Sequence, residues 1–202
     1  MPAKGGRPRI GIWYHPALAQ GGGIGRYTRG LVDALLALPA TAGADIVLVA
    51  GRDAPPPARP WHSGSDRHEG PPAAVHQRRL PLSERALTIL WQRLRAPLPV
   101  DRWLGGLDLF HSPDYTLPPL ARARGLVTVH DLSYLAWPDG ALPSLRRYLT
   151  RTVPRSCARA HRVLADSEST RRDLRRFLDL PAERIEVVGA GVEPRFHRPA
   201  ED

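Results

Sequence analysis

Two pairs of polar residues stand directly after apolar stretches of the sequence, His130-Asp131 and His111-Ser112. An imidazole beside a carboxylate can form a metal pair, a general base with its orienting group, or a donor and acceptor for hydroxyls and phosphate oxygens. We expect His130 to face a ligand. For His111 a structural role and a ligand-facing role stay equally open.

Metal binding is disfavoured at both pairs. Neither H-x-x-H nor E-x-x-H spacing occurs in the sequence, and few carboxylates stand near the histidines. The single cysteine, Cys157, excludes an internal disulfide and has no partner at metal-ligand spacing. The G-x-S-x-G elbow and the Walker loop are also missing from the sequence, which removes the simplest hydrolase and P-loop interpretations. We expect no metal and no cofactor.

A glycine run offers a different chemistry. Gly21-Gly22-Gly23-Ile24-Gly25-Arg26-Tyr27 opens a helical pattern of apolar residues. A glycine-rich turn at the start of a helix lets backbone N–H groups approach an anion, and the helix dipole favours negative charge there. A phosphate or carboxylate is therefore expected at Gly22, Gly23, Ile24, Gly25 and Arg26. The alternative is a flexible turn whose glycines supply positive φ angles.

The glycine run does not match the dinucleotide fingerprint G-x-G-x-x-G. Thr28 stands where the third glycine should be, after Gly23 and Gly25. A nicotinamide or flavin cofactor is therefore not supported.

Runs of β-forming residues alternate with helical patterns along the chain. Strands are predicted at 9–14, 44–51, 74–80, 108–113, 125–131, 162–165 and 185–188. Helices are predicted at about 24–38, 83–95, 143–160 and 167–178, with Ser83 and Ser167 as caps. This alternation predicts a doubly wound, mostly parallel, Rossmann-like α/β domain. Ligands bind at the carboxyl edge of such sheets, where the glycine run and both histidine pairs are expected to lie.

The 202 residues are 42% hydrophobic, which is enough for one domain spanning 1–202 with a core of its own. Segment 53–74 has six prolines and no Val, Ile, Leu or Phe, and it is predicted to be a mobile surface loop. No apolar run approaches the roughly 18 residues that a membrane span requires. The basic N-terminus precedes a short apolar segment broken by His15 and Pro16, so we expect no cleaved signal peptide and a cytoplasmic protein.

The chain is strongly basic, with a net charge of +9, and Lys4 is its only lysine. The arginines are spread out and no nucleic-acid motif accompanies them, so nucleic acid is not an expected partner. In the predicted helix 143–160 arginines recur every four residues and form a basic ridge, and apolar residues form the opposite face. The ridge is Arg147, Arg151, Arg155 and Arg159, and the face is Leu145, Leu149 and Val153. Two interpretations of this ridge stay open. It is an ordinary solvated surface, or it makes peripheral contact with an anionic surface, which is either the inner face of a membrane or a lipid-phosphate acceptor.

Four motifs in this order make the chain resemble the N-terminal, acceptor-side domain of family 4 nucleotide-sugar glycosyltransferases, one half of a GT-B architecture. They are Gly22-Gly23-Ile24-Gly25-Arg26-Tyr27, Val127-Thr-Val-His-Asp-Leu132, Ala165-Asp-Ser-Glu-Ser-Thr-Arg-Arg-Asp-Leu174 and Ile185-Glu-Val-Val-Gly-Ala-Gly-Val-Glu-Pro-Arg-Phe196. The resemblance implies a retaining, hexosyltransferase-like enzyme of carbohydrate biosynthesis. Its implied substrates are a nucleotide-sugar donor and a carbohydrate or lipid-linked acceptor.

The resemblance also implies roles for particular residues. The glycine run would lie against the donor diphosphate and the transferred sugar. His130 would face that sugar near the reaction centre, and Asp131 would help to shape the site. Ser167 would be a helix cap or a contact at the cleft, where His111 and Ser112 are further candidates for the acceptor side. Because the family has no well-established covalent nucleophile in this domain, electrostatic and positioning roles are expected.

In the GT-B architecture a second α/β domain follows and clamps the nucleotide phosphates. Here the sequence ends at Asp202, where the resemblance places the crossing to that domain. Three interpretations stay open: a truncated piece, a half that works with a separate C-terminal chain, and a non-catalytic binding module for a sugar or phosphorylated ligand. The isolated chain is expected to be inactive. No motif in the sequence specifies the donor, the acceptor or the oligomeric state.

Overall fold

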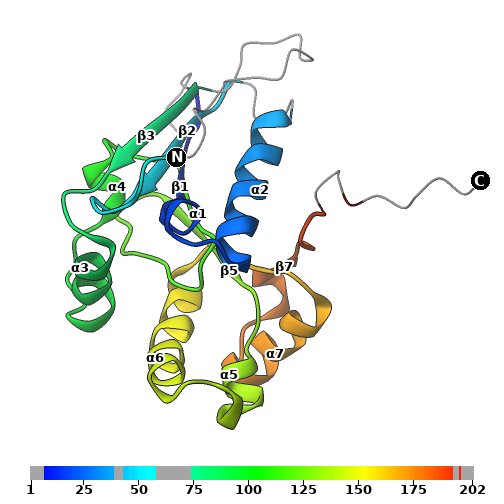
Figure 1. Ribbon diagram of the computed structural model, residues 1–202. Helices are drawn as coiled ribbons and strands as arrows, with labels where there is room; N and C mark the ends of the chain where they lie inside the picture. The colour runs from blue at the N-terminus through cyan, green and yellow to red at the C-terminus, as the bar shows by residue number, and fades with distance from the viewer. Residues whose placement is uncertain (1–6, 39–42, 58–73, 193–195, 197–202) are drawn as a thin grey trace, which may run out of the picture.

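A computed structural model describes residues 7–38, 43–57, 74–192 and 196. Its centre is a seven-stranded sheet with strand order β3-β2-β1-β4-β5-β6-β7, in which every pairing is parallel (Figure 1). The strands are β1 (Arg9–Trp13), β2 (Asp45–Ala50), β3 (Ala74–Arg79), β4 (Leu109–Ser112), β5 (Arg124–Val129), β6 (Arg162–Ala165) and β7 (Ile185–Val187). The predicted doubly wound, Rossmann-like α/β fold is therefore confirmed, and it is consistent with half of a GT-B architecture.

The position of each strand follows from its side chains. Central β2 is a continuous apolar run, and five of its six residues are buried, as expected of a parallel strand covered on both faces. In β3, at one edge, four of the six residues are exposed. Edge strands accept charged residues because one side of the strand faces solvent.

Helices cover both faces of the sheet (Figure 1). They are α1 (His15–Ala19), α2 (Gly23–Ala37), α3 (Glu84–Thr88), the π-helix η2 (Ile89–Arg93), α4 (Val100–Trp103), α5 (Ser133–Ala136), α6 (Pro143–Arg159) and α7 (Glu168–Leu178). Two short 3₁₀ helices are η3 (Pro138–Gly140) and η4 (Ala182–Arg184).

Successive residues of β2 point to opposite faces and so belong to two different cores. Ile46 and Leu48 pack in a smaller core that includes Val32 of α2. Val47 and Val49 belong to a larger core. The larger core also contains Leu87, Trp91, Phe110, Val127, Val129, Val153 and Leu174.

Some details of the predicted helices are corrected. Ser83 does cap α3 by accepting a hydrogen bond from the Ala86 N–H at 3.2 Å. The sequence predicts Leu87, Leu90, Trp91 and Leu94 on one side of helix 83–95, but the helix changes to the π-helix η2, whose wider turn moves Leu94 out of this apolar face. Leu94 is 69% exposed. In α6 Val153 is buried as predicted, but Leu145, in the first turn, is 47% exposed.

Two other predictions need comment. His15-Pro16 does end the first strand, but it also begins α1, because proline is well tolerated in the first turn of a helix. Of the predicted mobile loop 53–74, residues 58–73 lie outside the described residues. Within the described ranges, none of the helices has the length and apolar character that a membrane span requires.

Candidate active site

His130 lies at the carboxyl edge of the sheet, immediately after β5, with both ring nitrogens near oxygen atoms. Its Nε2 is 3.0 Å from the Pro113 carbonyl oxygen, and its Nδ1 is 3.3 Å from Oδ2 of Asp166, which follows β6. The His130 side chain is 15% exposed. Contacts at both ring nitrogens fix the orientation of the imidazole.

Two tyrosine rings enclose His130. Tyr27 of α2 packs edge-to-face against the imidazole with ring centroids 4.9 Å apart, and Tyr115 does so at 5.5 Å. Tyr27 is the last residue of the glycine motif, so its contact brings the start of α2 and His130 into one site. Burial raises the pKa of Tyr27, which keeps its hydroxyl protonated.

Asp131 is held by neighbouring groups. Its Oδ1 accepts hydrogen bonds from the Ser133 N–H at 2.9 Å and the Ser133 hydroxyl at 2.5 Å, and its Oδ2 accepts one from the Tyr115 hydroxyl at 2.8 Å. Burial acts to raise the pKa of Asp131, but these hydrogen bonds and the nearby His130 outweigh burial and lower it. Asp131 is therefore a carboxylate that fixes Tyr115 and the start of α5 beside His130.

In the glycine run one glycine is closely packed and the others border open space. Among the described glycines, positive φ occurs at Gly43, Gly105 and Gly106, so the interpretation of the run as a positive-φ turn is wrong. A Cβ at Gly25 would lie 2.1 Å from the Gln20 carbonyl oxygen, which makes glycine necessary there. A Cβ at Gly21, Gly22 or Gly23 would meet no atom within 4 Å.

The start of α2 presents backbone donors to this open space. Gly22 is the N-cap residue and supplies no side-chain cap, so the N–H groups of Gly23, Ile24 and Gly25 have no capping side chain. Arg26, the remaining predicted anion ligand, is exposed, and its guanidinium lies 5.6 Å from the Phe196 ring centroid. The geometry suits an anion at the glycine run.

His111 and Ser112 lie inside the sheet. His111 is 4% exposed, and its Nε2 is 2.9 Å from the Thr128 hydroxyl of β5. Burial, together with the charge of His130, lowers the pKa of His111 to about 4. Ser112 is fully buried and donates to the Thr116 carbonyl at 2.5 Å. These contacts favour a structural role for His111 over a ligand-facing role.

Ser167 caps α7, as predicted, by accepting from the Thr170 N–H at 3.1 Å. The Thr170 hydroxyl lies 2.8 Å from the His130 carbonyl oxygen and 3.2 Å from Oδ1 of Asp166. The cap therefore belongs to the network that holds His130 and its partner Asp166.

Asp114 is a site residue that the sequence reasoning missed. It lies two residues after β4, and burial raises the pKa of its carboxyl to about 6 against the opposing influence of His130. The Asp114 side chain makes no hydrogen bond within the part of the chain that the structure describes. A carboxyl with a raised pKa beside a candidate site can accept or donate a proton near neutral pH. Its place directly after a strand end was the available signal.

Tyr27, Tyr115 and Asp166 were also missed as partners of His130. Tyr27 and Asp166 belong to two of the quoted motifs, but their contacts depend on how α2 and the ends of β4, β5 and β6 meet. In the described ranges, no three His, Cys, Asp or Glu side chains gather as a metal site requires.

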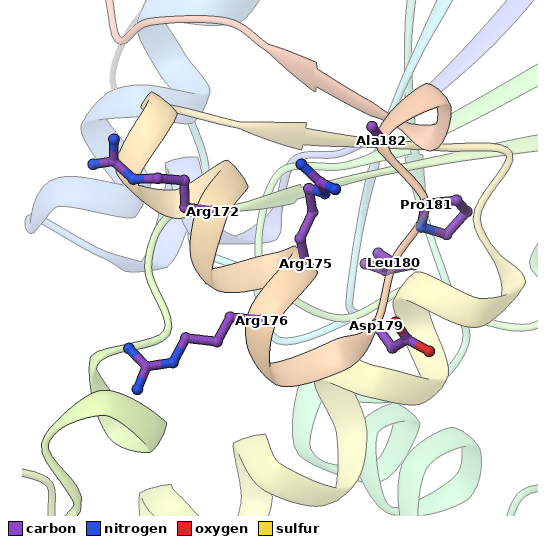
Figure 2. A pocket seen from close by; sticks show the side chains of 7 residues that line it. All are labelled: Arg172, Arg175, Arg176, Asp179, Leu180, Pro181 and Ala182. Atoms are coloured by element: carbon purple, nitrogen blue, oxygen red, sulfur yellow. The ribbon is translucent and has the colours of Figure 1, made fainter.

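A cavity at the end of α7 lies away from these residues. It has a volume of about 460 Å³ and is lined by the end of α7 and by residues 179–182, which lead to the amino end of β7. Figure 2 shows the side chains of Arg172 and Arg176 extending away from that segment and the side chain of Arg175 lying nearer to it. The site around His130 is at the opposite edge of the sheet.

Comparison with known proteins identifies the family of the chain. No curated protein matches the sequence. A protein-family model described as Glycosyltransferase Family 4 matches residues 21–196, which include the glycine run, His130 and Asp166. Because this match spans most of the chain, the protein belongs to glycosyltransferase family 4, and its function is of the glycosyltransferase type.

Proposed function

We propose that this domain is the acceptor-side half of a retaining glycosyltransferase that moves a sugar from a nucleotide-sugar donor to a carbohydrate or lipid-linked acceptor. The observation that carries the proposal is the contact between Tyr27 and His130, with ring centroids 4.9 Å apart. It joins an anion-binding helix start to a fixed imidazole within one site.

In this proposal the start of α2 binds the donor diphosphate. The N–H groups of Gly23, Ile24 and Gly25 supply hydrogen bonds, and the helix dipole adds favourable potential. The open space at Gly21, Gly22 and Gly23 lets the phosphates come close to the backbone.

His130 then acts on the transferred sugar. Both of its nitrogens have protein partners, so the Nε2–H must pass from the Pro113 carbonyl to a sugar hydroxyl when the donor binds, while Asp166 holds Nδ1. Asp131 keeps Tyr115 beside the imidazole. These are positioning and electrostatic contributions, which need no nucleophile from this domain.

We propose that the nucleotide is held by a second α/β domain, on the same polypeptide or on another. A cleft between two such domains would exclude water and close the donor against His130. The nucleotide and the sugar would be selected largely by the second domain.

The test is to combine this domain with a candidate nucleotide-binding domain and measure transfer from a panel of nucleotide sugars. His130→Ala should lower turnover about 100-fold or more, the scale for losing one preorganised polar group. His161→Ala is the matched control, because His161 is exposed and its side chain forms no hydrogen bond or ion pair with the residues that the structure describes. NMR of the product should show the anomeric configuration of the donor.

Near wild-type turnover of a folded His130→Ala enzyme would contradict the proposal. His130-dependent binding of a sugar or phosphorylated ligand without any turnover would instead favour a non-catalytic binding module.

We also propose peripheral contact with an anionic membrane surface near the start of α6. Trp137 is 78% exposed and Leu142 is 71% exposed, and the arginines Arg146, Arg147 and Arg151 that follow are exposed as well. Apolar side chains beside arginines are typical of segments that lie at a membrane interface.

A further inference from the structure

A second cavity, of about 250 Å³, lies between η2 and the C-terminal half of α6. Its lining includes Trp91, Gln92, Arg95, Pro119, Arg155 and Arg159. Arg159 ends α6 just before β6, and Pro119 precedes β5, so the cavity is near the amino ends of the strands. His130 follows the carboxyl end of β5, and the cavity is therefore separate from the candidate active site.

The cavity concentrates positive charge. Three of the residues that line it are arginines, and the lining contains no Asp or Glu. Arg95 and Arg155 form no ion pair or side-chain hydrogen bond within the described ranges, while Arg159 donates to the Leu117 carbonyl. Burial, together with the like charge of Arg155, lowers the pKa of Arg159. An anion in the cavity would relieve this repulsion.

Gln92 provides an independent observation. It is 8% exposed and lines the cavity, and its side-chain amide makes no hydrogen bond to any residue that the structure describes. An amide that lines the cavity and has no protein partner there can form hydrogen bonds to a bound ligand.

The backbone around the cavity is unusual. Gln92 belongs to the π-helix η2, and Arg95, two residues after that helix, has a positive φ of 55°. π-Helical turns and left-handed non-glycine residues are both concentrated at functional sites. Here both features bring cavity-lining side chains together.

The remaining walls are apolar. The Trp91 indole N–H donates to the Leu98 carbonyl at 3.0 Å, so the indole offers only its ring to the cavity. Pro119 adds a second apolar surface. A ligand that fits this lining has a compact anionic group joined to an apolar or flat body.

We propose that this cavity binds a small organic phosphate ester, with the phosphate held by Arg95, Arg155 and Arg159 and by the Gln92 amide. The planar guanidinium groups match phosphate oxygens in pairs, which a lysine cluster would not do. The organic part of the ester packs on Trp91 and Pro119. The volume of the cavity is that of a small molecule and not of a polymer surface.

The arginines of the larger cavity do not support the same inference. Asp179 is part of that lining, and Arg175 and Arg176 occupy the last turn of α7, where the helix dipole favours cations. Those arginines have structural reasons to be there.

The test is calorimetric titration of the 202-residue chain with phenyl phosphate, inorganic phosphate and phenol. Phenyl phosphate should bind one to one and more tightly than inorganic phosphate, and phenol should not bind measurably. Arg155→Gln and Arg95→Gln should each weaken phenyl phosphate about tenfold or more, because each removes a charged hydrogen-bond donor. Arg151→Gln is the matched control, since Arg151 is exposed on α6 one turn before Arg155.

Weakening by Arg151→Gln equal to that by Arg155→Gln would show diffuse attraction to a basic surface and overturn the proposal, as would the absence of phenyl phosphate binding. Gln92→Leu separates a ligand role from a structural one. It should leave the free protein at least as stable as the wild type and weaken phenyl phosphate binding. Lower stability with unchanged affinity would overturn the role of the cavity.

Discussion

The two histidines near the centre of the sheet differ in what surrounds them. His130 has acceptors at both nitrogens and two tyrosine rings beside it at the sheet edge. His111 is one strand away, buried within β4, and has the Thr128 hydroxyl as its partner. The first arrangement is built to present a fixed imidazole to a ligand. The second is built to keep a neutral ring inside the core.

The buried His111 predicts a pH dependence of stability. The unfolded chain takes up a proton at His111 near pH 6.5, whereas the folded protein takes it up only near pH 4. Protonation therefore favours the unfolded state, and the free energy of unfolding should fall as the pH is lowered from about 6.5 to 4. Each unit of difference in pKa corresponds to about 1.4 kcal/mol, so the free energy of unfolding should fall by an amount on the order of 3 kcal/mol.

His111→Gln is the comparison variant, since glutamine can keep a hydrogen bond to Thr128 without titrating. Urea unfolding at several pH values should show a smaller loss of stability in the variant between pH 6.5 and 4. The raised pKa of Asp114 acts in the opposite sense but is present in both proteins. Parallel stability curves for the two proteins would show that His111 does not stay neutral in the fold.

At the residue scale the sequence predicts positions better than partners. His130 was predicted from its place after an apolar run, and Ser167 from its place before a helical pattern. Asp166 and Tyr115 were not selected, because their contacts with His130 form only when strands from separate parts of the sequence align, and Asp114 was not selected because its burial depends on the same alignment. The ambiguity of His111 had the same cause, since burial is decided by the neighbouring strand.

At the scale of elements, the start of α2 separates two uses of glycine. Gly25→Ala should destabilise the protein by about 1–3 kcal/mol, the usual cost of overpacking, because its Cβ would meet the Gln20 carbonyl. Gly23→Ala should not lower stability, since its Cβ has open space and alanine favours a helix. The measurement is the urea midpoint of each variant.

The same pair of variants tests the donor site. In the reconstituted enzyme Gly23→Ala should weaken donor binding although the fold is intact, because the added methyl group enters the space proposed for the diphosphate. Unchanged donor affinity in Gly23→Ala would mean that this space is not used.

Helix α6 predicts a divided role for its arginines. Arg147 and Arg151 lie outside the smaller cavity, whereas Arg155 and Arg159 line it. Binding to anionic vesicles should therefore weaken with salt. The double variant Arg147→Gln, Arg151→Gln should weaken it more than the double variant Arg155→Gln, Arg159→Gln does. Each arginine near the surface contributes about 1 kcal/mol. Cosedimentation with anionic and neutral vesicles measures this. Equal binding to both kinds of vesicle, or none to either, would remove the membrane proposal.

The strands were easier to predict than the helices. The buried run of β2 leaves little choice, and the predicted and observed limits of β6 coincide. The short α4 and α5, of four residues each, lack enough length for a helical period. The π-helix η2 was invisible because its residues continue the apolar spacing of α3 until the turn widens.

At the scale of the whole molecule, the proposed reaction needs a second domain beside the site around His130. We predict that the purified 202-residue chain unfolds cooperatively but transfers no sugar, because the proposed clamp for the nucleotide belongs to a second domain and positioning supplies a large part of the rate. Thermal unfolding and an assay with a panel of nucleotide sugars would test both halves of this prediction. Measurable transfer by the chain alone would contradict it.

The segment 113–117 is fastened at both ends. The Pro113 carbonyl and the Tyr115 ring contact His130, while the Leu117 N–H donates to the Ser156 hydroxyl at 3.0 Å and the Leu117 carbonyl accepts from Arg159. A phosphate that draws Arg159 away from Leu117 would act on the segment that holds the imidazole. If the phosphate changes the affinity for the donor by some factor, thermodynamic reciprocity requires that the donor changes the affinity for the phosphate by the same factor.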